Sequence, residues 1–294
     1  GIFVNKSQKH GIMVNRFSFE NMLSFKEPQE FSLKASAKKE RLFDDSQNYV
    51  ENAKDVKTLT SAVLYGANAS GKSNLIKAFL HFRNFIITGN QNLDSLEFAV
   101  PNFQLDAEKA KMPAQFEIDC FWKGKNYRYG FSVVNTGVEE EWLYVKEKRE
   151  SEVFYRKKQA FTILAKHKIL NELTSKKMVH SKAFLVTIGA QFNDAACAGF
   201  LEWVHHFNII SGIEDRSYKA YTVKRMKESS AFSEKVVELI KFADFGIEDI
   251  SVNSFQGQNI KLTVGDSSSV ELEPSTVDDL MSKRFVMNSK GIPE

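Results

Sequence analysis

The chain has 294 residues and a formal net charge of +3, with 43% hydrophobic and 26% charged residues. This composition is ordinary for a soluble globular protein, and the length suffices for one large domain or two small ones. No apolar run approaches the roughly eighteen residues of a membrane span, and residues 1–9 do not resemble a signal peptide, so we expect a cytoplasmic protein with no membrane partner. The net charge is too small to indicate nucleic-acid binding through a global field.

The amino-terminal part predicts two strands joined by a tight connection. Residues 1–13 show no clear pattern and are expected to be a tail or an expression remnant. Residues 14–21 and 30–34 alternate apolar and polar side chains, as half-buried strands do, and residues 21–28 resemble a hairpin connection. The polar residues 35–59 predict an extended surface loop.

The next stretch is the one around which the chain is organised. It reads Gly66-Ala67-Asn68-Ala69-Ser70-Gly71-Lys72-Ser73-Asn74-Leu75 and fits the phosphate-binding pattern G-x-x-x-x-G-K-[ST]. In such a loop backbone N–H groups and the start of a helix surround a polyphosphate, Lys72 reaches the β- and γ-phosphates, and the Ser73 hydroxyl binds Mg²⁺. The alternative is a Gly/Ser-rich turn that matches by accident.

The surroundings of the loop favour phosphate binding. Residues 61–65 form a short apolar run that could be a buried parallel strand. After Lys72, four apolar residues at helical spacing predict a helix that ends near Gly89: Leu75, Phe79, Phe82 and Ile86.

Further along, residues 91–113 predict a connector and residues 115–165 an antiparallel meander of strands. Residues 156–182 are basic, which is consistent with a solvated face or with a patch for phosphates or nucleic acid. Cys120 and Cys197 are too few and too distant for a metal cluster and are expected to be core residues.

The carboxyl-terminal third predicts both helices and strands. An apolar strand is expected at residues 183–188, followed by helices at residues 195–207 and 230–243. The last strands are expected at residues 245–252, 259–264 and 284–287.

The order of these motifs resembles a known family. The strand Arg16-Phe17-Ser18-Phe19-Glu20-Asn21, the connection Leu23-Ser24-Phe25 and the phosphate loop look like the start of ABC-type ATPase heads of the SMC, RecF and OLD-nuclease kind. Within that group the chain resembles bacterial AAA-family ATPases related to OLD nucleases and to abortive-infection and phage-defence systems. Weaker likenesses lie in Phe116-Glu117-Ile118, Tyr127–Phe131, residues 190–193 and residues 244–250.

The resemblance implies ATP and Mg²⁺ as cofactors of the loop from Gly66 to Asn74. It also implies that Gln191, expected just past a strand, senses the γ-phosphate and Mg²⁺, although a polar helix cap is an equally good interpretation. Arg16 and Ser24 occupy the positions where such heads contact the base and ribose.

The chain also departs from the family pattern. Residues 277–280 lack the apolar run that precedes a catalytic Asp-Glu pair, and Ser289-Lys290-Gly291 fits a hairpin turn better than a signature loop. We therefore expect the remaining catalytic residues to come after Glu294, and we expect this chain to bind ATP better than it hydrolyses it.

Together these features predict an α/β, P-loop ABC-ATPase-like head with a mixed sheet, an antiparallel meander and a partial helical lobe. The nucleotide-binding lobe is expected at residues 14–188 and an incomplete second lobe at residues 189–294. The predicted function couples ATP binding and homodimerisation of the heads to a nuclease or toxin partner acting on DNA or RNA, as in phage defence. The alternatives are a non-hydrolysing ATP-binding scaffold or sensor and a RecF- or RecN-like DNA-repair ATPase.

Overall fold

The computed structural model describes residues 2–4, 13–35, 49–52, 56–89, 99–147, 149–210, 216–243, 247–252, 260–264 and 268–272. The chain divides into two compact units, Gly1–Ile209 and Ile210–Glu294. The lobe boundary that the sequence predicts after Ile188 stays a prediction. The residues that follow it, among them Cys197, Phe200 and Trp203, pack into the core of the first unit.

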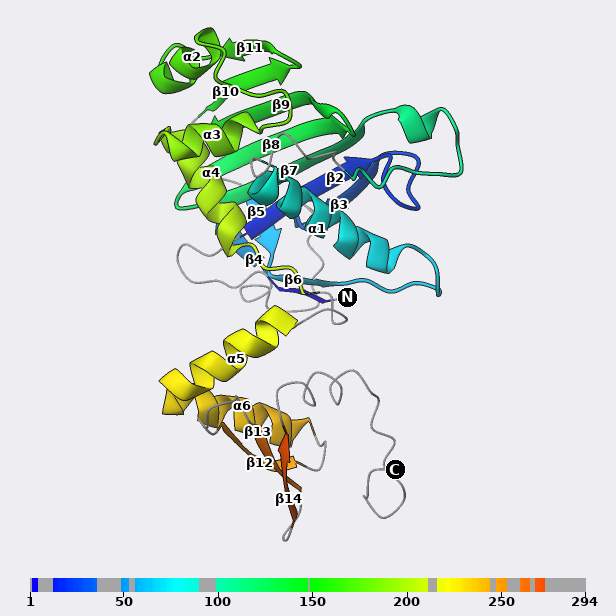
Figure 1. Cartoon of the computed structure of the whole chain (residues 1–294), viewed down its shortest axis with the longest axis vertical. Helices are drawn as coiled ribbons and strands as arrows, with labels where there is room; N and C mark the ends of the chain where they lie inside the picture. The colour runs from blue at the N-terminus through cyan, green and yellow to red at the C-terminus, as the bar shows by residue number, and fades with distance from the viewer. Residues whose placement is uncertain are drawn as a thin grey trace. The chain divides into compact units, whose positions relative to one another are not determined.

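The first unit is built on a seven-stranded antiparallel sheet (Figure 1). In spatial order its strands are β11 (Ala160–Ile163), β10 (Glu150–Lys157), β9 (Gly137–Lys146), β8 (Lys125–Val134), β7 (Ala114–Trp122), β2 (Met13–Glu20) and β3 (Gln29–Ser32). The predicted meander and the predicted first hairpin are therefore confirmed. Every pair of strands among the described residues is antiparallel.

Helices cover one face of this sheet (Figure 1). They are α1 (Lys72–Thr88), α3 (Leu185–Gln191) and α4 (Ala195–His206), and α2 (Lys168–Ser175) follows β11. Phe82 of α1 stacks on Phe131 of β8 with ring centroids 5.6 Å apart, and Phe200 of α4 packs on Tyr129 at 4.5 Å. These buried rings explain the high phenylalanine content, because they form the core between the sheet and the helices.

The sequence predicted helices α1 and α4 close to their observed bounds, and Gly89 is the C-cap of α1. Cys120 and Cys197 are free, fully buried core residues, as expected. Helices α2 and α5 and strand β14 were not predicted.

Four sequence predictions about the first unit are wrong. Ile2–Val4 is strand β1, not a tail, and it pairs antiparallel with β6 (Ser61–Val63). Strand β6 is therefore not a buried parallel strand, and Val63 is 50% exposed. The expected surface loop at residues 35–59 contains a hairpin of β4 (Tyr49–Asn52) and β5 (Val56–Leu59).

The fourth error concerns residues 183–188, which are not a strand: Phe184 is the N-cap of helix α3, and residues 185–188 lie inside that helix. A short apolar run has no periodicity that separates a buried strand from a buried helix. The helix is fixed by a distant residue, because the Glu141 carboxylate accepts hydrogen bonds from the backbone N–H groups of Leu185 and Val186 at 2.8 and 3.0 Å.

The second unit contains α5 (Arg216–Glu228), α6 (Ser230–Phe242) and a three-stranded antiparallel sheet. The strands are β12 (Ile247–Val252), β13 (Ile260–Val264) and β14 (Ser268–Leu272). The predicted helix at residues 230–243 is confirmed, and the Ser229 hydroxyl caps it by accepting from the N–H of Phe232 at 3.3 Å. The predictions for residues 277–280, 284–287 and 289–291 lie outside the described residues.

Candidate nucleotide-binding site

The phosphate loop leads directly into helix α1. Gly71 precedes the helix with φ +91°, and Ala69 has φ +62°, so the chain turns through the left-handed region twice within three residues. A Cβ atom on Gly66 would lie 2.8 Å from the Ser70 Oγ atom, and one on Gly71 would lie 2.6 Å from the Phe25 ring. Glycine is therefore required at Gly71 for its backbone conformation and for space, whereas at Gly66 a side chain would only have to displace the Ser70 hydroxyl.

The amino end of α1 is open to an anion. No side chain caps this end, and its first turn contains no acidic residue. The first N–H groups of a helix have no partner within the helix, and the helix dipole adds partial positive charge there. Residues 66–70 and Ser73 are exposed, so a ligand can approach these groups from solvent.

Lys72 places a cation at the loop. Its ammonium group donates to the backbone oxygens of Gly66 and Ala67 at 2.7 and 2.6 Å and to the Ser70 Oγ atom at 3.3 Å. These partners belong to the loop itself, so the lysine is folded back over the residues that would surround a phosphate. Because carbonyl oxygens are neutral, a phosphate oxygen would be the stronger partner for this ammonium group.

The hairpin after β2 supports the loop from one side. Asn74 donates to the Ser24 Oγ atom at 2.8 Å, and the Phe25 ring lies against Gly71. Phe25 is in turn held edge-on against Phe19, with ring centroids 5.1 Å apart. Of the two residues expected to contact the base and ribose, the structure therefore brings Ser24 to the loop.

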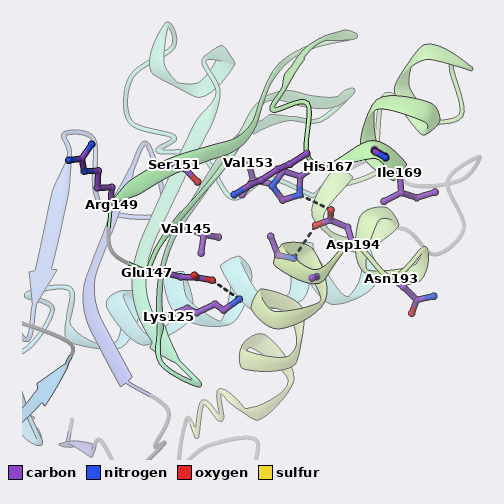
Figure 2. Close-up of a pocket in the computed structure, with 14 residues that line it drawn as sticks. Lys125, Val145, Glu147, Arg149, Ser151, Val153, His167, Ile169, Asn193 and Asp194 are labelled. Carbon is purple, nitrogen blue, oxygen red and sulfur yellow. Dashed lines mark hydrogen bonds and ion pairs between the residues drawn. The ribbon is translucent and has the colours of Figure 1, made fainter.

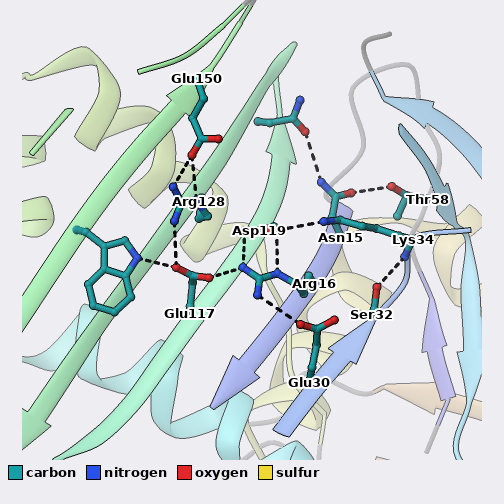
Figure 3. A network of polar contacts seen from close by, with 12 residues as sticks. Asn15, Arg16, Glu30, Ser32, Lys34, Thr58, Glu117, Asp119, Arg128 and Glu150 are labelled. Atoms are coloured by element: carbon teal, nitrogen blue, oxygen red, sulfur yellow. Dashed lines mark hydrogen bonds and ion pairs between the residues drawn. The ribbon is translucent and has the colours of Figure 1, made fainter. Parts of the chain in front are cut away.

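Arg16 is not brought to the loop. Its neighbour Phe17 stacks on Phe79 of α1 at 4.0 Å, and since adjacent residues in a strand point to opposite faces, Arg16 lies on the face away from that helix. There it binds Asp119 at 2.9 Å, Glu30 at 3.4 Å and also Glu117 (Figure 3). The hydrogen bond to Asp119 raises the pKa of the guanidinium group further above its ordinary value. Its donors are used by carboxylates in this structure, and its contact with the nucleotide stays a prediction.

Gln191 is also not brought to the loop. It is the exposed last residue of helix α3, so the prediction that it follows a strand is wrong. Thr187 in the same helix donates to the Ile86 carbonyl at 3.1 Å, near the carboxyl end of α1. At 1.5 Å per residue this end lies roughly 20 Å from Ser73, so the structure separates the two predicted Mg²⁺ ligands.

A buried asparagine that the sequence did not indicate holds the supporting hairpin. Asn21 is 1% exposed, has φ +54° and donates to the carbonyls of Lys109 and Met112 at 2.7 and 2.9 Å. Its side-chain oxygen accepts from the N–H of Phe103 at 3.3 Å. Asn21 thus ties the hairpin to the segment before β7. Its position at the end of a predicted strand was the only signal in the sequence.

The basic stretch at residues 156–182 is divided in the structure. Arg156 is fully buried, whereas Lys157, Lys158 and Lys176 are exposed and paired with Glu140, Glu139 and Glu172. The interpretation as a solvated face therefore describes these lysines well. Among the described residues no group of three or more His, Cys, Asp or Glu could hold a metal ion.

The loop residues fit a polyphosphate with Mg²⁺. The uncapped helix start supplies N–H donors, Lys72 supplies a cation, and the exposed Ser73 hydroxyl lies in the first turn. This set matches the donors that bind nucleotide phosphates and their magnesium ion in P-loop proteins.

Comparison with known proteins supports the same chemistry. Residues 61–177 match the family model described as "AAA domain, putative AbiEii toxin, Type IV TA system". The matched segment, which is less than half of the chain, contains the phosphate loop, α1 and strands β7 to β11. The segment is thus similar to AAA-type P-loop ATPase domains of an abortive-infection or toxin–antitoxin class, and the mixed α/β architecture fits that fold. No curated protein matches the chain.

None of the helices in the described residues has both the length and the apolar character needed to cross a bilayer.

Proposed function

We propose that the chain binds a nucleoside triphosphate, with ATP and Mg²⁺ as its cofactors, through residues 66–74. The observation that carries this proposal is the Lys72 ammonium group, held over a glycine loop at the uncapped start of a 17-residue helix. The family match over residues 61–177, which include the loop, also supports it, because that model describes an AAA domain.

In this proposal each loop residue has a separate role. The N–H groups of the loop and of the first helical turn bind phosphate oxygens, and Lys72 moves from the Gly66 and Ala67 carbonyls to the β- and γ-phosphates. Ser73 offers its hydroxyl to Mg²⁺, which would neutralise phosphate charge there. The Asn74 side chain fixes the helix start through Ser24, while its backbone N–H belongs to the first helical turn.

We further propose that nucleotide binding brings two heads together and controls a nuclease or toxin partner that acts on DNA or RNA. The similarity of residues 61–177 to a putative toxin family of a Type IV toxin–antitoxin system supports this context. The exposure of residues 66–70 and Ser73 is consistent with a second head covering the nucleotide.

Nucleotide binding is tested by thermal unfolding of the full chain with ATP and Mg²⁺. A ligand at about 100 times its Kd stabilises the folded state by about 2.7 kcal/mol, so the melting temperature should rise by several degrees. AMP, which lacks the β- and γ-phosphates, should give no comparable rise. An equal rise with AMP and ATP would contradict a polyphosphate site.

Dimerisation is tested separately by analytical ultracentrifugation with and without ATP and Mg²⁺. The wild-type chain should shift toward a dimer with ATP, and Ser73→Ala should shift less because its Mg²⁺ ligand is lost. A monomer under all conditions, with ATP bound, would overturn the dimer while leaving nucleotide binding intact.

A second candidate function is a non-hydrolysing ATP-binding scaffold or sensor. One observation favours it. In the described part of the chain, Lys72 and Asn74 donate to backbone carbonyls and serine hydroxyls and not to a carboxylate. The first turn of α1 also contains no acidic residue. A side chain that positions the attacking water, such as a carboxylate or a glutamine, is a usual part of NTP-hydrolysing sites. Release of inorganic phosphate from ATP by the chain alone, lost in Lys72→Ala, would exclude the scaffold.

A further inference from the structure

A second site lies on the first unit, at an open cavity of about 730 Å³ that no role of the phosphate loop explains (Figure 2). Strands β8 to β10 form one side, and the amino ends of α2 and α4 form the other. A cavity of this volume is of the size that small-molecule ligands occupy.

Cationic side chains outnumber carboxylates along this cavity. Lys125 is paired with Glu147 at 2.9 Å, but within the described residues no carboxylate lies at ion-pair distance from Arg149, Lys166 or Lys168. Helix α2 begins at Lys168 without a side-chain cap, which adds partial positive charge from its dipole. The lining also contains the carboxylates of Glu147 and Asp194, but the four cationic side chains outnumber them, and an excess of one charge around a concave surface raises the local concentration of a ligand of opposite charge.

A histidine–aspartate pair provides an oriented donor at the same cavity. The His167 Nδ1 atom lies 2.8 Å from the Asp194 Oδ2 atom, and Asp194 also accepts from the N–H groups of Ala196 and Cys197 at 3.1 Å. The two side chains are only 11% and 5% exposed, so their geometry is fixed by packing (Figure 2). Because a neutral imidazole has one donor nitrogen and Nδ1–H faces the carboxylate, Nε2 acts as a donor only in a ring that carries both protons.

The other nitrogen of this histidine has no partner. The His167 Nε2 atom is buried and forms no hydrogen bond in the described part of the chain. A buried polar atom without a partner costs about 1 to 3 kcal/mol, so such atoms usually mark the place of a ligand or an ordered water. An oxyanion would satisfy Nε2–H and neutralise the neighbouring lysines together.

The cavity walls restrict what the ligand is. None of the described residues that line it is Phe, Tyr or Trp, and the apolar wall consists of Val145, Val153 and Ile169. Proteins that bind bases of single strands use aromatic rings for stacking, and this cavity has none to offer. The lining therefore selects for a charged group and not for a nucleobase.

We propose that this cavity binds the phosphate group of an anionic ligand, held by Lys166, Lys168 and the Nε2–H of His167. This phosphate site is distinct from the phosphate loop and does not depend on the function proposed for that loop. The phosphate could belong to a free small molecule or to a nucleic-acid backbone, which present the same oxyanion.

The test is calorimetric titration of the full chain with pyrophosphate, in four proteins: wild type, Lys72→Ala, Lys166→Gln/Lys168→Gln, and the combination. Lys72→Ala should keep one binding event, the cavity variant should lose that event, and the combination should bind nothing. The removal of two charge-assisted contacts should weaken the cavity event by roughly 100-fold. Loss of all binding in Lys72→Ala alone would overturn the proposal.

The matched control is Lys157→Gln/Lys158→Gln, which removes the same charge from exposed positions outside the cavity. This control should change the affinity for pyrophosphate by less than about threefold. An effect equal to that of the cavity variant would show that the lysines attract pyrophosphate only nonspecifically, and it would overturn the proposal.

His167→Asn keeps a donor toward Asp194 but removes Nε2. It should weaken pyrophosphate binding without lowering the melting temperature, and full affinity in this variant would contradict the histidine's role.

The source of the phosphate is read from competition in the Lys72→Ala protein. A twelve-nucleotide oligothymidylate that displaces pyrophosphate would assign the site to a nucleic-acid backbone. An oligonucleotide that binds without displacing pyrophosphate, or does not bind, would assign it to a small phosphate ligand.

Discussion

Lys72 and Arg156 are both cations that donate to backbone carbonyls, but the partners of Lys72 are exposed and those of Arg156 belong to the buried core. Lys72 binds two carbonyls of an exposed loop. Arg156 is 0% exposed and donates to the carbonyls of Lys158, His180, Ser181 and Ala183 as well as to Glu141. A ligand can replace the partners of the first residue, whereas only unfolding can release those of the second.

The difference shows how a cation that binds a ligand can be distinguished from a cation that stabilises the fold. Both residues lie in stretches that suggested phosphates, the loop and the basic run at residues 156–182. What distinguishes them is desolvation. Burial lowers the pKa of Arg156 and raises the pKa of Glu141, so each needs the other to remain charged. Lys72 lies at an exposed loop, so exchanging its carbonyl partners for a phosphate requires no buried charge to be left without a partner.

The largest effect is expected from breaking the buried pair. Arg156→Met leaves the Glu141 carboxylate buried without its cation, which should lower the free energy of unfolding by about 3 to 5 kcal/mol in a urea titration. Arg156→Met/Glu141→Gln should recover part of the loss, because glutamine is neutral and its one side-chain oxygen still accepts from one of the two N–H groups at the amino end of α3. The exposed neighbour supplies the control, and Lys157→Met should change stability by about 0.5 kcal/mol or less. If Arg156→Met were as mild as Lys157→Met, the buried pair would not hold α3.

A smaller effect is expected from the hairpin that supports the loop. Ser24→Ala removes the acceptor of the Asn74 side chain and should cost about 0.5 to 1.5 kcal/mol, because one partly exposed hydrogen bond is lost. Asn74→Ala should cost a similar amount, and the double variant should cost little more than either single variant, since both remove the same bond. Fully additive losses in the three urea titrations would mean that Ser24 and Asn74 do not act through each other.

The smallest effect concerns an ion pair beside the same hairpin. Lys26 lies 2.8 Å from Asp106, and its hydrogen bond, with those from the N–H groups of Lys109 and Glu108, lowers the pKa of Asp106 to about 2. A carboxyl whose pKa is lowered in the folded state stabilises the protein above its unfolded pKa, and that contribution disappears as the pH falls from about 4 toward 2.

Lys26→Ala should raise the pKa of Asp106 toward its ordinary value, as followed by the carboxyl carbon shift in an NMR titration. Lys34→Ala, which removes a lysine paired with a different carboxylate, is the control and should leave the pKa of Asp106 unchanged. An unchanged pKa in Lys26→Ala would show that the backbone N–H groups alone lower it.

Local patterns made the sheet and the loop predictable. The alternation in β7 to β10 and the helical spacing after Lys72 are properties of neighbouring residues, and the glycine spacing of the loop is fixed by its own backbone. The order of strands around β2 could not be read in this way, because β2 pairs with β7 across about ninety intervening residues.

For α3, Arg16 and Gln191 the sequence predictions and the structure differ for one reason: the positions of these residues depend on partners that lie far away in the sequence. Helix α3 looked like a strand because its amino end is fixed by Glu141, more than forty residues earlier. Arg16 looked available because its three carboxylate partners come from β3 and β7. Gln191 was assigned by resemblance, and its position follows from the packing of α3 on the far end of α1.

The central claim is that Lys72 acts on a nucleotide and not on the fold, and isothermal titration of ATP with Mg²⁺ into wild type and Lys72→Ala tests it most directly. We predict that the variant binds ATP about 100-fold more weakly, the equivalent of two charge-assisted hydrogen bonds, while its melting temperature without ligand stays within about 2 °C of wild type. Unchanged ATP affinity in a folded Lys72→Ala protein would contradict the account.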